Sequence, residues 1–368
     1  MKEEPNSILI IKLSAIGDVV HTLPLLEVLR QNFPHCRIDW LVEEEASQLI
    51  DGHEGLDHLI VSQRRSWQRR VLKGGELWGV FREVKRFLKD LRSVEYDVVM
   101  DLQGLFKSGL LTGISRGKRK IGFTGAREGS ILSLTERPSF FDYDKHALDR
   151  YLKVTEYLRG TKRPWKGDIP IREADKRYID EIIQENGLKK EKLVAINPMA
   201  RWRTKLWETG SFAVLADRLQ KELSCHTVFT GSRADRSTID EIIRIMDGKA
   251  INLAGRTSLK ELAYLYARCR LMISTDTGPM HVAAAMGCAV VALFGPTAPW
   301  RTGPYGEGHK VIREDLECSP CFKKRCARPV CMKNITVEKV FETVKGFFPP
   351  DLSGATGHRQ GRKRENEH

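Results

Sequence analysis

One carboxylate in the first part of the chain stands where it could do chemistry. Asp18 ends the segment 14–18 (SAIGD), which follows an apolar run and precedes a stretch of helical periodicity. At a helix start an aspartate often only caps the backbone, because its oxygens accept hydrogen bonds from N–H groups without a helical partner. The same position, at the carboxyl end of a strand, also points a carboxylate into a cleft, where it can take a proton from an acceptor hydroxyl. Both interpretations stay open from this segment alone.

A second group of candidate residues lies in the stretch 270–295, where an apolar strand leads through a turn into a helix of small residues. Gly278 lets a ligand approach the backbone, a proline suits the first helical turn, and the exposed N–H groups there attract phosphate. Asp276 and His281 flank this turn. Taken singly, Asp276 is as typical of a helix cap, and His281 of a packed ring, as either is of a ligand contact. Together with Thr277 and the helix start, they favour a nucleotide site.

Two cations follow another candidate strand, which lies earlier in the chain. Arg201 and Lys205 lie in the stretch 197–207 (NPMARWRTKLW), between a predicted strand and a predicted helix. Cations at such a position can stabilise the negative charge that develops on a departing diphosphate. They therefore add a candidate phosphate contact to the half of the chain that contains the nucleotide site.

Four of the eight cysteines are clustered near the C-terminus, at positions Cys318, Cys321, Cys326 and Cys331. A C-x-x-C pair with two further thiols can bind Zn²⁺ tetrahedrally, although this spacing is not the paired C-x-x-C form. A structural zinc site is one interpretation, and reduced, packed or redox-sensitive thiols are the other.

These residues need a scaffold, and the first half predicts one by alternating short apolar runs with stretches of helical periodicity. Strands are expected at 7–13, 38–42, 59–61, 98–100 and 120–123, and helices at 18–33, 75–93 and 144–159. This βα repeat predicts a mainly parallel, doubly wound α/β sheet that binds ligands at the carboxyl ends of its strands. The first turn has one glycine and an acid instead of G-x-G-x-x-G, which argues against a nicotinamide enzyme.

A second βα series follows the segment 160–170, which contains two glycines and two prolines and is interpreted as a linker. Its strands are expected at 193–196, 227–229, 271–273 and 290–294, and its helices at 172–186, 210–223, 234–246, 258–268, 278–286 and 336–348. We predict two Rossmann-like domains, 1–163 and 164–350, that face a central cleft, with the last helix free to pack back on the first domain. Residues 351–368 are polar and are predicted to form a disordered tail.

The net charge of +13 is concentrated in the first half. Residues 61–92 contain ten Lys or Arg against three Asp or Glu, and residues 116–127 contain five without an acid. Such a field attracts nucleic acid, an anionic membrane surface or an acidic glycolipid, although part of it is a solvated helix face. No apolar run approaches the roughly 18–20 residues that span a bilayer. Residues 1–6 (MKEEPN) lack the features of an export signal, so we expect a cytoplasmic location.

The chain resembles glycosyltransferase family 9, the ADP-heptose:lipopolysaccharide heptosyltransferases, over nearly its whole length to about residue 348. The resemblance rests on IIKLSAIGDVVHTLP (10–24), DLQGLFKS (101–108), KLW (205–207), STDTGPMHVAAAMG (274–287) and FGPT (294–297). DWLVEEEASQL (39–49), Arg64-Arg65-x-Trp67 and Ala126-Arg127-Glu128 are most similar to type I members, which add the first heptose to the Kdo residues of lipid A.

The resemblance implies a GT-B fold and a transfer with inversion, in which Asp18 is the catalytic base. On the donor side it implies contacts from Lys205, Asp235, Thr257, Asp276, Thr277, Gly278 and His281, with Asp235 and Thr257 at the nucleoside. On the acidic acceptor side it implies contacts from Lys12, Arg64, Arg65 and Arg127. One departure is Ala200-Arg201, where some members have a hydroxyl pair near the phosphates.

The resemblance implies neither a cofactor nor a metal for catalysis. Residues 142–144 form a D-x-D string, which in other glycosyltransferases holds a divalent metal, but here they precede a predicted helix and are interpreted as capping.

We therefore predict an enzyme of lipopolysaccharide inner-core synthesis that moves a heptose from ADP-heptose to the Kdo of lipid A. We expect no nucleic acid partner, and we expect peripheral contact with the inner leaflet through the basic first half. One alternative is another family-9 transferase, such as heptosyltransferase II or an enzyme for a different sugar. The other is a non-catalytic nucleotide- or nucleic-acid-binding protein, which leaves Asp18 unexplained and lacks the interleaved aromatic residues of a stacking platform.

Overall fold

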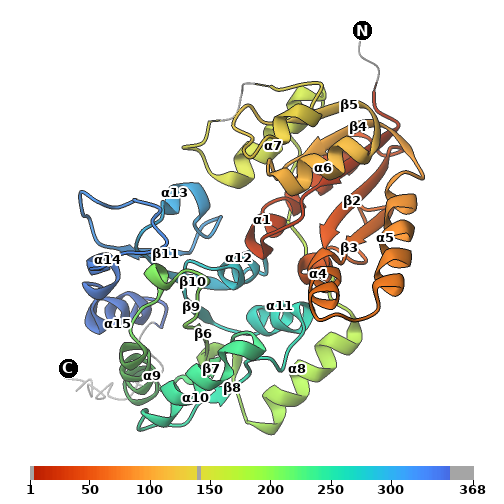
Figure 1. Cartoon of the computed structure of the whole chain (residues 1–368). Coiled ribbons are helices and arrows are strands. Elements are labelled where there is room, and N and C mark those ends of the chain that lie inside the picture. Colours follow the sequence, from red (N-terminus) through yellow and green to blue (C-terminus); the bar gives the residue numbers. More distant parts are fainter. Residues whose placement is uncertain (1–3, 139–141, 349–368) are drawn as a thin grey trace, which may run out of the picture.

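Two parallel β-sheets organise the chain, one in each half (Figure 1). The computed structural model describes residues 4–138 and 142–348, so the predicted tail at 351–368 lies outside the described residues. The first sheet has the strand order β3-β2-β1-β4-β5. Its strands are β1 (Ser7–Ile11), β2 (Arg37–Glu43), β3 (His58–Ser62), β4 (Glu95–Asp101) and β5 (Arg116–Gly122).

The helices of the first half connect these strands. They are α1 (Ile16–Val20), α2 (Leu23–Asn32), α3 (Glu44–Ser47), α4 (Arg64–Leu72), α5 (Leu77–Leu91), α6 (Phe106–Ile114) and α7 (Ala147–Tyr157). The single helix predicted at 18–33 is wrong, because the chain forms α1 and α2 with a break between them. Pro24 lies in the first turn of α2, and in one continuous helix its ring would clash with the carbonyl of Val20.

The second sheet has the order β11-β10-β9-β6-β7-β8, again with parallel pairing throughout. Its strands are β6 (Leu193–Asn197), β7 (His226–Phe229), β8 (Ile251–Asn252), β9 (Leu271–Thr275), β10 (Ala289–Phe294) and β11 (Lys310–Arg313). Its helices are α8 (Glu173–Glu185), α9 (Thr209–Leu223), α10 (Arg236–Arg244), α11 (Leu259–Ala267), α12 (Gly278–Ala285), α13 (Pro299–Thr302), α14 (Val330–Lys333) and α15 (Val337–Lys345). None of the described helices is both long enough and apolar enough to cross a bilayer.

The last described helix, α15, packs within the second half and not back on the first, contrary to one of our expectations. Its buried residues Val340, Phe341 and Val344 lie in the core cluster of the second sheet. The Arg218 guanidinium of α9 lies 3.8 Å from the centroid of the Phe341 ring and forms an ion pair with Glu338. Because the apolar face of α15 is already buried against the second half, no apolar surface of this helix is left to pack on the first half.

Buried hydrophobic side chains cover both faces of each sheet, as expected for parallel sheets with helices on both sides. One of these clusters is continuous from the first half into the second, from Ile8 and Leu26 to Leu262 and Met280. The halves also contact each other through α1 and α12, which meet between the two sheets in Figure 1. The segment between α7 and α8 contains neither helix nor strand, and the boundary at 163/164 within it stays a prediction.

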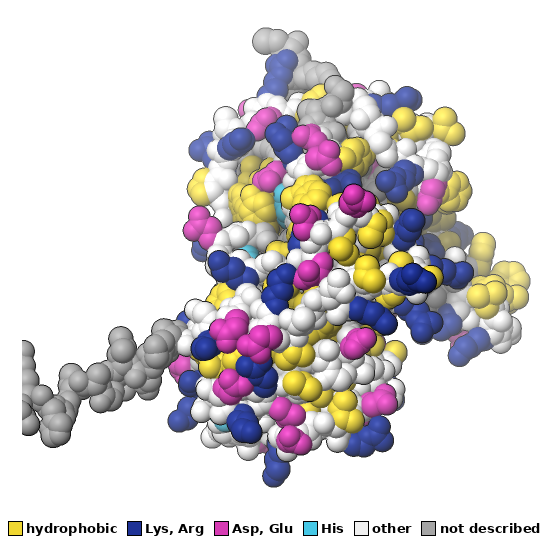
Figure 2. All heavy atoms as spheres, turned by 90° about the vertical axis from the view of Figure 1, so that its left-hand side faces the viewer, with side chains coloured by type: hydrophobic (Ala, Val, Ile, Leu, Met, Phe, Trp, Pro, Cys, Tyr) yellow, Lys and Arg dark blue, Asp and Glu magenta, His cyan; other side chains and the backbone are white. Residues whose placement is uncertain are grey.

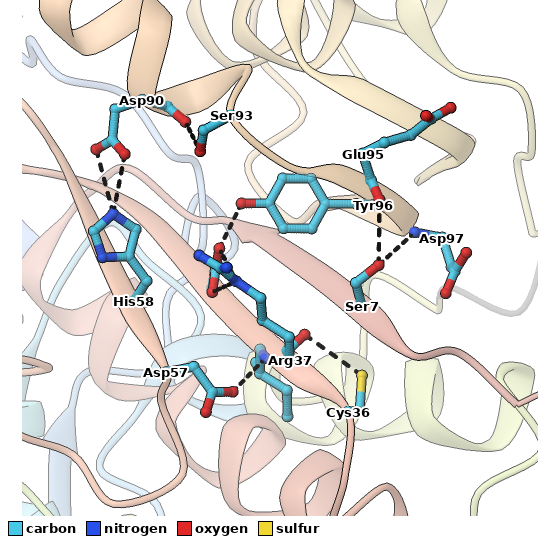
Figure 3. A network of polar contacts seen from close by, with 12 residues as sticks. Ser7, Cys36, Arg37, Asp57, His58, Asp90, Ser93, Glu95, Tyr96 and Asp97 are labelled. Carbon is cyan, nitrogen blue, oxygen red and sulfur yellow. Dashed lines mark hydrogen bonds and ion pairs between the residues drawn. The ribbon is translucent and has the colours of Figure 1, made fainter.

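A polar network lies near the N-terminal ends of strands in the first sheet (Figure 3). The fully buried Asp39 accepts a hydrogen bond of 2.6 Å from the Tyr96 hydroxyl and two of 3.0 Å from Arg37 Nε. His58 and Asp90 form a further pair, with 3.1 Å between the ring Nε2 and the carboxylate. Because these groups satisfy one another at the edge opposite to the strand C-termini, the network stabilises the fold and leaves the other edge for ligands.

Candidate functional site

The predicted site residues follow strands at the C-terminal edges of the two sheets. In the first half, Lys12 and Asp18 follow β1, Arg64 and Arg65 follow β3, and Arg127 follows β5. In the second half, Arg201 and Lys205 follow β6, Asp235 follows β7, Thr257 follows β8, and Asp276, Thr277, Gly278 and His281 follow β9. The contact of α1 with α12 therefore brings the loops after β1 and β9 together across the cleft.

Asp18 is the third residue of α1, and both functions considered for it are compatible with its geometry. One carboxylate oxygen accepts a hydrogen bond of 3.1 Å from the Ala15 N–H, which is the capping interaction. The other oxygen lies 3.9 Å from Lys12 Nζ, and the side chain keeps 39% of its surface exposed. A helix cap thus orients a carboxylate that is still accessible to a substrate.

Lys12 is buried behind Asp18. Its ammonium donates hydrogen bonds to the Leu102 carbonyl at 2.9 Å and to the Tyr151 hydroxyl at 2.7 Å. Burial by itself lowers the pKa of Lys12, but the charge of Asp18 and the contact with Tyr151 outweigh it and raise the pKa. The charged ammonium of Lys12 therefore attracts the carboxylate of Asp18. The predicted contact of Lys12 with an acceptor stays a prediction.

A buried carboxylate that the sequence analysis did not single out brings the basic residues together. Glu43 ends β2, and one of its oxygens accepts hydrogen bonds from Arg64 and from Lys107, the latter at 3.0 Å. Arg65 lies 3.7 Å from the other oxygen and pairs with Glu45. Burial by itself raises the pKa of Glu43, but the hydrogen bonds from Arg64 and Lys107 hold it below its usual value.

Lys107 also connects this cluster to the loop of the predicted base, because its ammonium donates to the Ser14 hydroxyl at 2.8 Å. It belongs to the motif DLQGLFKS at 101–108, which was the available sequence signal. Arg127 is exposed, and its backbone N–H donates to the Gly104 carbonyl, which places it beside the same loop after β4.

On the opposite side of the cleft, Lys205 and Asp276 form an ion pair with 2.6 Å between Nζ and Oδ2. The Thr297 hydroxyl donates to the same oxygen at 2.5 Å, and Asp276 is buried. Lys205 also lies 4.6 Å from the centroid of the Trp202 ring, and Lys324 lies 5.3 Å from it. Asp276 thus positions Lys205, and Lys324 is a second cation that sequence reasoning missed.

Two glycines allow the start of α12 to contact α1. A Cβ atom on Gly278 would lie 2.9 Å from the Ile16 Cβ, and one on Gly17 would lie 2.2 Å from the His281 Cδ2. Because neither glycine can take a side chain without a shift, the start of α12 is held next to the turn that contains Asp18.

His281 packs into this contact and is buried, 4.3 Å from the His21 ring. Burial lowers the pKa of His281 to about 4, so the ring is neutral near pH 7. Burial also lowers the pKa of His21, and neither of its ring nitrogens has a hydrogen-bond partner among the described residues. The contact of His281 with a donor stays a prediction, but its packing role is evident.

The predicted nucleoside contacts lie in neighbouring loops. The carboxylate of Asp235 accepts hydrogen bonds from the N–H and the hydroxyl of Ser232, at 2.8 and 2.6 Å. Gly255, two residues before Thr257, lies against Arg233, since a Cβ there would be 2.6 Å from the Arg233 Cα. The loops after β7 and β8 are therefore side by side, at the same sheet edge as Lys205.

The four clustered thiols line one small cavity of about 30 Å³, and Cys331 is buried while Cys318 and Cys326 are exposed. Within residues 4–138 and 142–348, no three His, Cys, Asp or Glu side chains are arranged to hold a metal ion. The zinc interpretation stays a prediction.

The D-x-D string does not cap α7 as expected, because His146 is the capping residue, with its ring accepting a hydrogen bond from the Leu148 N–H. Asp142 instead accepts one from the Asp144 N–H within the preceding turn.

A partly exposed carboxylate on one side of a cleft and a lysine with a helix start on the other define a group-transfer enzyme of two Rossmann-like domains. The family model described as glycosyltransferase family 9 (heptosyltransferase) matches residues 84–331, and the chain belongs to this family.

Relatives and solved structures agree with this assignment. Lipopolysaccharide heptosyltransferase 1 of Pseudomonas aeruginosa is 30% identical over 338 residues, which are 87% of each chain. Lipopolysaccharide heptosyltransferase 1 of Escherichia coli K12 is 28% identical over 84% of this chain and 94% of its own. The crystal structure of the glycosyl transferase family 9 from Veillonella parvula superposes with a TM-score of 0.79 at 26% identity, covering 95% of this chain and 98% of that one. The predicted GT-B fold and glycosyltransferase class are thereby confirmed.

Proposed function

We propose that this glycosyltransferase moves a heptose from ADP-heptose to the Kdo of a lipid A precursor, with inversion at the anomeric carbon. Both relatives described above are named lipopolysaccharide heptosyltransferase 1, which supports the donor sugar and the type. The observation that carries the proposal is the contact of α1, which contains Asp18, with the start of α12. Lys205 belongs to the same region, since it pairs with Asp276, two residues before α12 begins.

In this reaction Asp18 takes the proton of the acceptor hydroxyl while the oxygen of that hydroxyl attacks the anomeric carbon. The buried Lys12 ammonium lies 3.9 Å from the Asp18 carboxylate and attracts it, which helps to hold it in position. The bond to the diphosphate breaks on the opposite face of the sugar. Lys205, Arg201 and the N–H groups at the start of α12 stabilise the negative charge of the departing ADP.

The acidic acceptor meets the basic side of the first half. Arg64, Arg65 and Lys107 are held near one another by Glu43, so their donors are positioned before an anion arrives. Preorganised guanidinium groups suit the carboxylate of Kdo, because they can bind it through two parallel hydrogen bonds. Since the acceptor is a lipid, the enzyme associates peripherally with the inner leaflet of the cytoplasmic membrane.

Two other functions remain as outcomes of a direct test. Incubation with ADP-heptose and Kdo–lipid A, followed by mass analysis, should show one added heptose. Transfer only from another nucleotide sugar, or only to an acceptor that already has a heptose, would identify a different member of the family. ADP binding without any transfer would favour the non-catalytic alternative.

The role of the base is tested by Asp18→Asn, which keeps the size and can still accept the capping hydrogen bond. Loss of a general base should lower kcat by about 10²–10⁴. Asp175→Asn is the matched control, since Asp175 occupies the same capping-box position in α8 and is not in the cleft. A rate for Asp18→Asn within a few-fold of the control would exclude Asp18 as the base.

A further inference from the structure

A cluster of large apolar side chains is exposed where α4 leads into α5. We call residues 69–82 the α4–α5 tip. Five of its apolar residues leave between 43% and 86% of their surface exposed, namely Val71, Leu72, Leu77, Trp78 and Phe81. Single exposed apolar residues are ordinary, but a group of this size within eleven positions indicates an interaction surface.

The tip is anchored to the fold through one face of α5 and through Trp67 of α4, although α4 itself has no buried residue. Val80, Phe87 and Leu91 are the buried residues of α5. The Trp67 ring of α4 lies edge-on to Phe87, at 5.5 Å between centroids, and its Nε1–H donates to Glu83 at 2.9 Å. The tip therefore projects from the fold with its large apolar side chains exposed, and among them Trp78 and Phe81 contact each other edge-on, with 6.2 Å between the ring centroids.

Exposed cations surround the apolar group. Arg69, Lys73, Arg82, Lys85 and Arg86 are exposed and form no ion pair with another described residue. The acids of this region, Glu76 and Glu83, are both paired with Arg70. The right-hand edge of Figure 2 is the side nearest the viewer in Figure 1, where α4 lies, and it shows hydrophobic side chains beside Lys and Arg.

We propose that the α4–α5 tip is the membrane-docking surface, with Leu72, Leu77, Trp78 and Phe81 in the headgroup–acyl boundary of an anionic bilayer. Aromatic and leucine side chains flanked by Lys and Arg are the composition that binds this boundary, and each cation near an anionic surface adds attraction. A purely apolar partner would leave these cations without counter-charges, whereas the headgroups of anionic lipids would pair with them.

The place of the tip in the fold fits a lipid acceptor, and in this respect the inference rests on the proposed function. Arg64 and Arg65 begin the helix that Leu72 ends. Nine residues of α-helix are about 13 Å long. Docking at the tip would therefore hold the acceptor cations a short distance above the bilayer, at the depth of the sugars linked to a lipid anchor.

Co-sedimentation of the full chain with vesicles tests the proposal. Wild-type chain should bind vesicles of phosphatidylethanolamine and phosphatidylglycerol, and bind pure phosphatidylcholine vesicles at least about tenfold more weakly. Leu72→Ser with Trp78→Ser should weaken binding to the anionic vesicles about ten- to hundredfold. Leu132→Ser with Val214→Ser is the control, since both residues are exposed apolar side chains elsewhere.

Charge is tested in the same assay. Lys73→Glu with Lys85→Glu should weaken binding to anionic vesicles about tenfold or more, whereas Lys221→Glu with Lys249→Glu in the second half should change it little. Quenching by brominated lipid should be larger for wild type than for Trp78→Phe, because Trp78 is the indole expected inside the bilayer.

The outcomes separate this inference from the proposed function. Sugar transfer to a water-soluble, deacylated acceptor should be unchanged in Leu72→Ser with Trp78→Ser. Transfer by a wild-type chain that does not bind vesicles would overturn the docking surface alone, and vesicle binding without transfer would overturn the function alone. Self-association of wild type that these two substitutions abolish, without vesicle binding, would assign the tip to a second copy of the chain.

Discussion

Substitution of Gly17 by alanine tests the contact on which the site depends. A Cβ atom at this position would lie 2.2 Å from the Cδ2 of His281, whereas ordinary van der Waals contacts begin at 3.4 Å. The histidine ring cannot simply retreat, because the His21 ring lies 4.3 Å behind it and both are buried. Relief must come from a separation of α1 and α12 by about 1 Å.

Overpacking of this kind costs roughly 1–3 kcal/mol of stability. The larger effect is expected in catalysis, because Asp18 is the next residue and a displacement of about 1 Å can cost about a hundredfold in rate. We therefore expect Gly17→Ala to lower Tm moderately and kcat by about two decades. Thermal denaturation and initial rates at saturating donor measure the two effects.

Gly210→Ala is the matched control. Nothing lies within 4 Å of its Cβ position in the first turn of α9, so Tm should stay the same or rise slightly. In a double-mutant cycle, His281→Ala should recover stability in the Gly17→Ala background, because it removes the atoms that clash. Wild-type values of Tm and kcat for Gly17→Ala would refute the close contact of the two helices.

Three further predictions concern the donor side and the clustered thiols. Lys205→Ala should lower the ADP affinity measured by calorimetry about ten- to hundredfold, as expected for loss of a charge-assisted contact of roughly 1.5–3 kcal/mol. It should also lower Tm, because the buried Asp276 loses its partner. An unchanged ADP affinity would show that Lys205 does not bind the donor. The pKa of His281 is about 4 in the folded chain and roughly 6.5 in the unfolded chain, so the unfolded chain binds more protons between these two pH values. The contribution of neutral His281 to the free energy of unfolding is therefore complete above pH 6.5, and it falls by up to about 3 kcal/mol as the pH is lowered to 4. His281→Gln should flatten the dependence of Tm on pH in that window, and an equally steep dependence would contradict the assignment. Zinc at the four clustered cysteines would give about one equivalent per purified chain and a lower Tm after chelation, whereas a metal-free chain with an unchanged Tm would leave packing or redox roles.

The alternation of strands and helices was determined by the sequence itself. The central strands such as β1, β6, β9 and β10 are runs of apolar residues that are mostly buried, and a local pattern is enough to recognise them. The basic strand β5 (Arg116–Gly122) was predicted only at 120–123, because its first residues are charged or glycine. The order of these elements also predicts that loops after the strands bind the ligand, which is why Asp18, Lys205 and Gly278 were chosen as candidate site residues. Short elements were missed, among them β8 (Ile251–Asn252), because two residues contain no periodicity.

What each charged residue does was decided only by the tertiary structure. Lys12 and Asp276 were predicted to contact ligands. In the structure both are buried, and Lys12 lies beside Asp18 while Asp276 pairs with Lys205. Glu43 was not singled out in the sequence, and it lies at the centre of a cationic cluster because β2 ends beside the starts of α4 and α6, which contain Arg64 and Lys107. Such pairings join residues far apart in the chain, and their charges interact only when folding removes water and fixes the distance, so no local pattern encodes them.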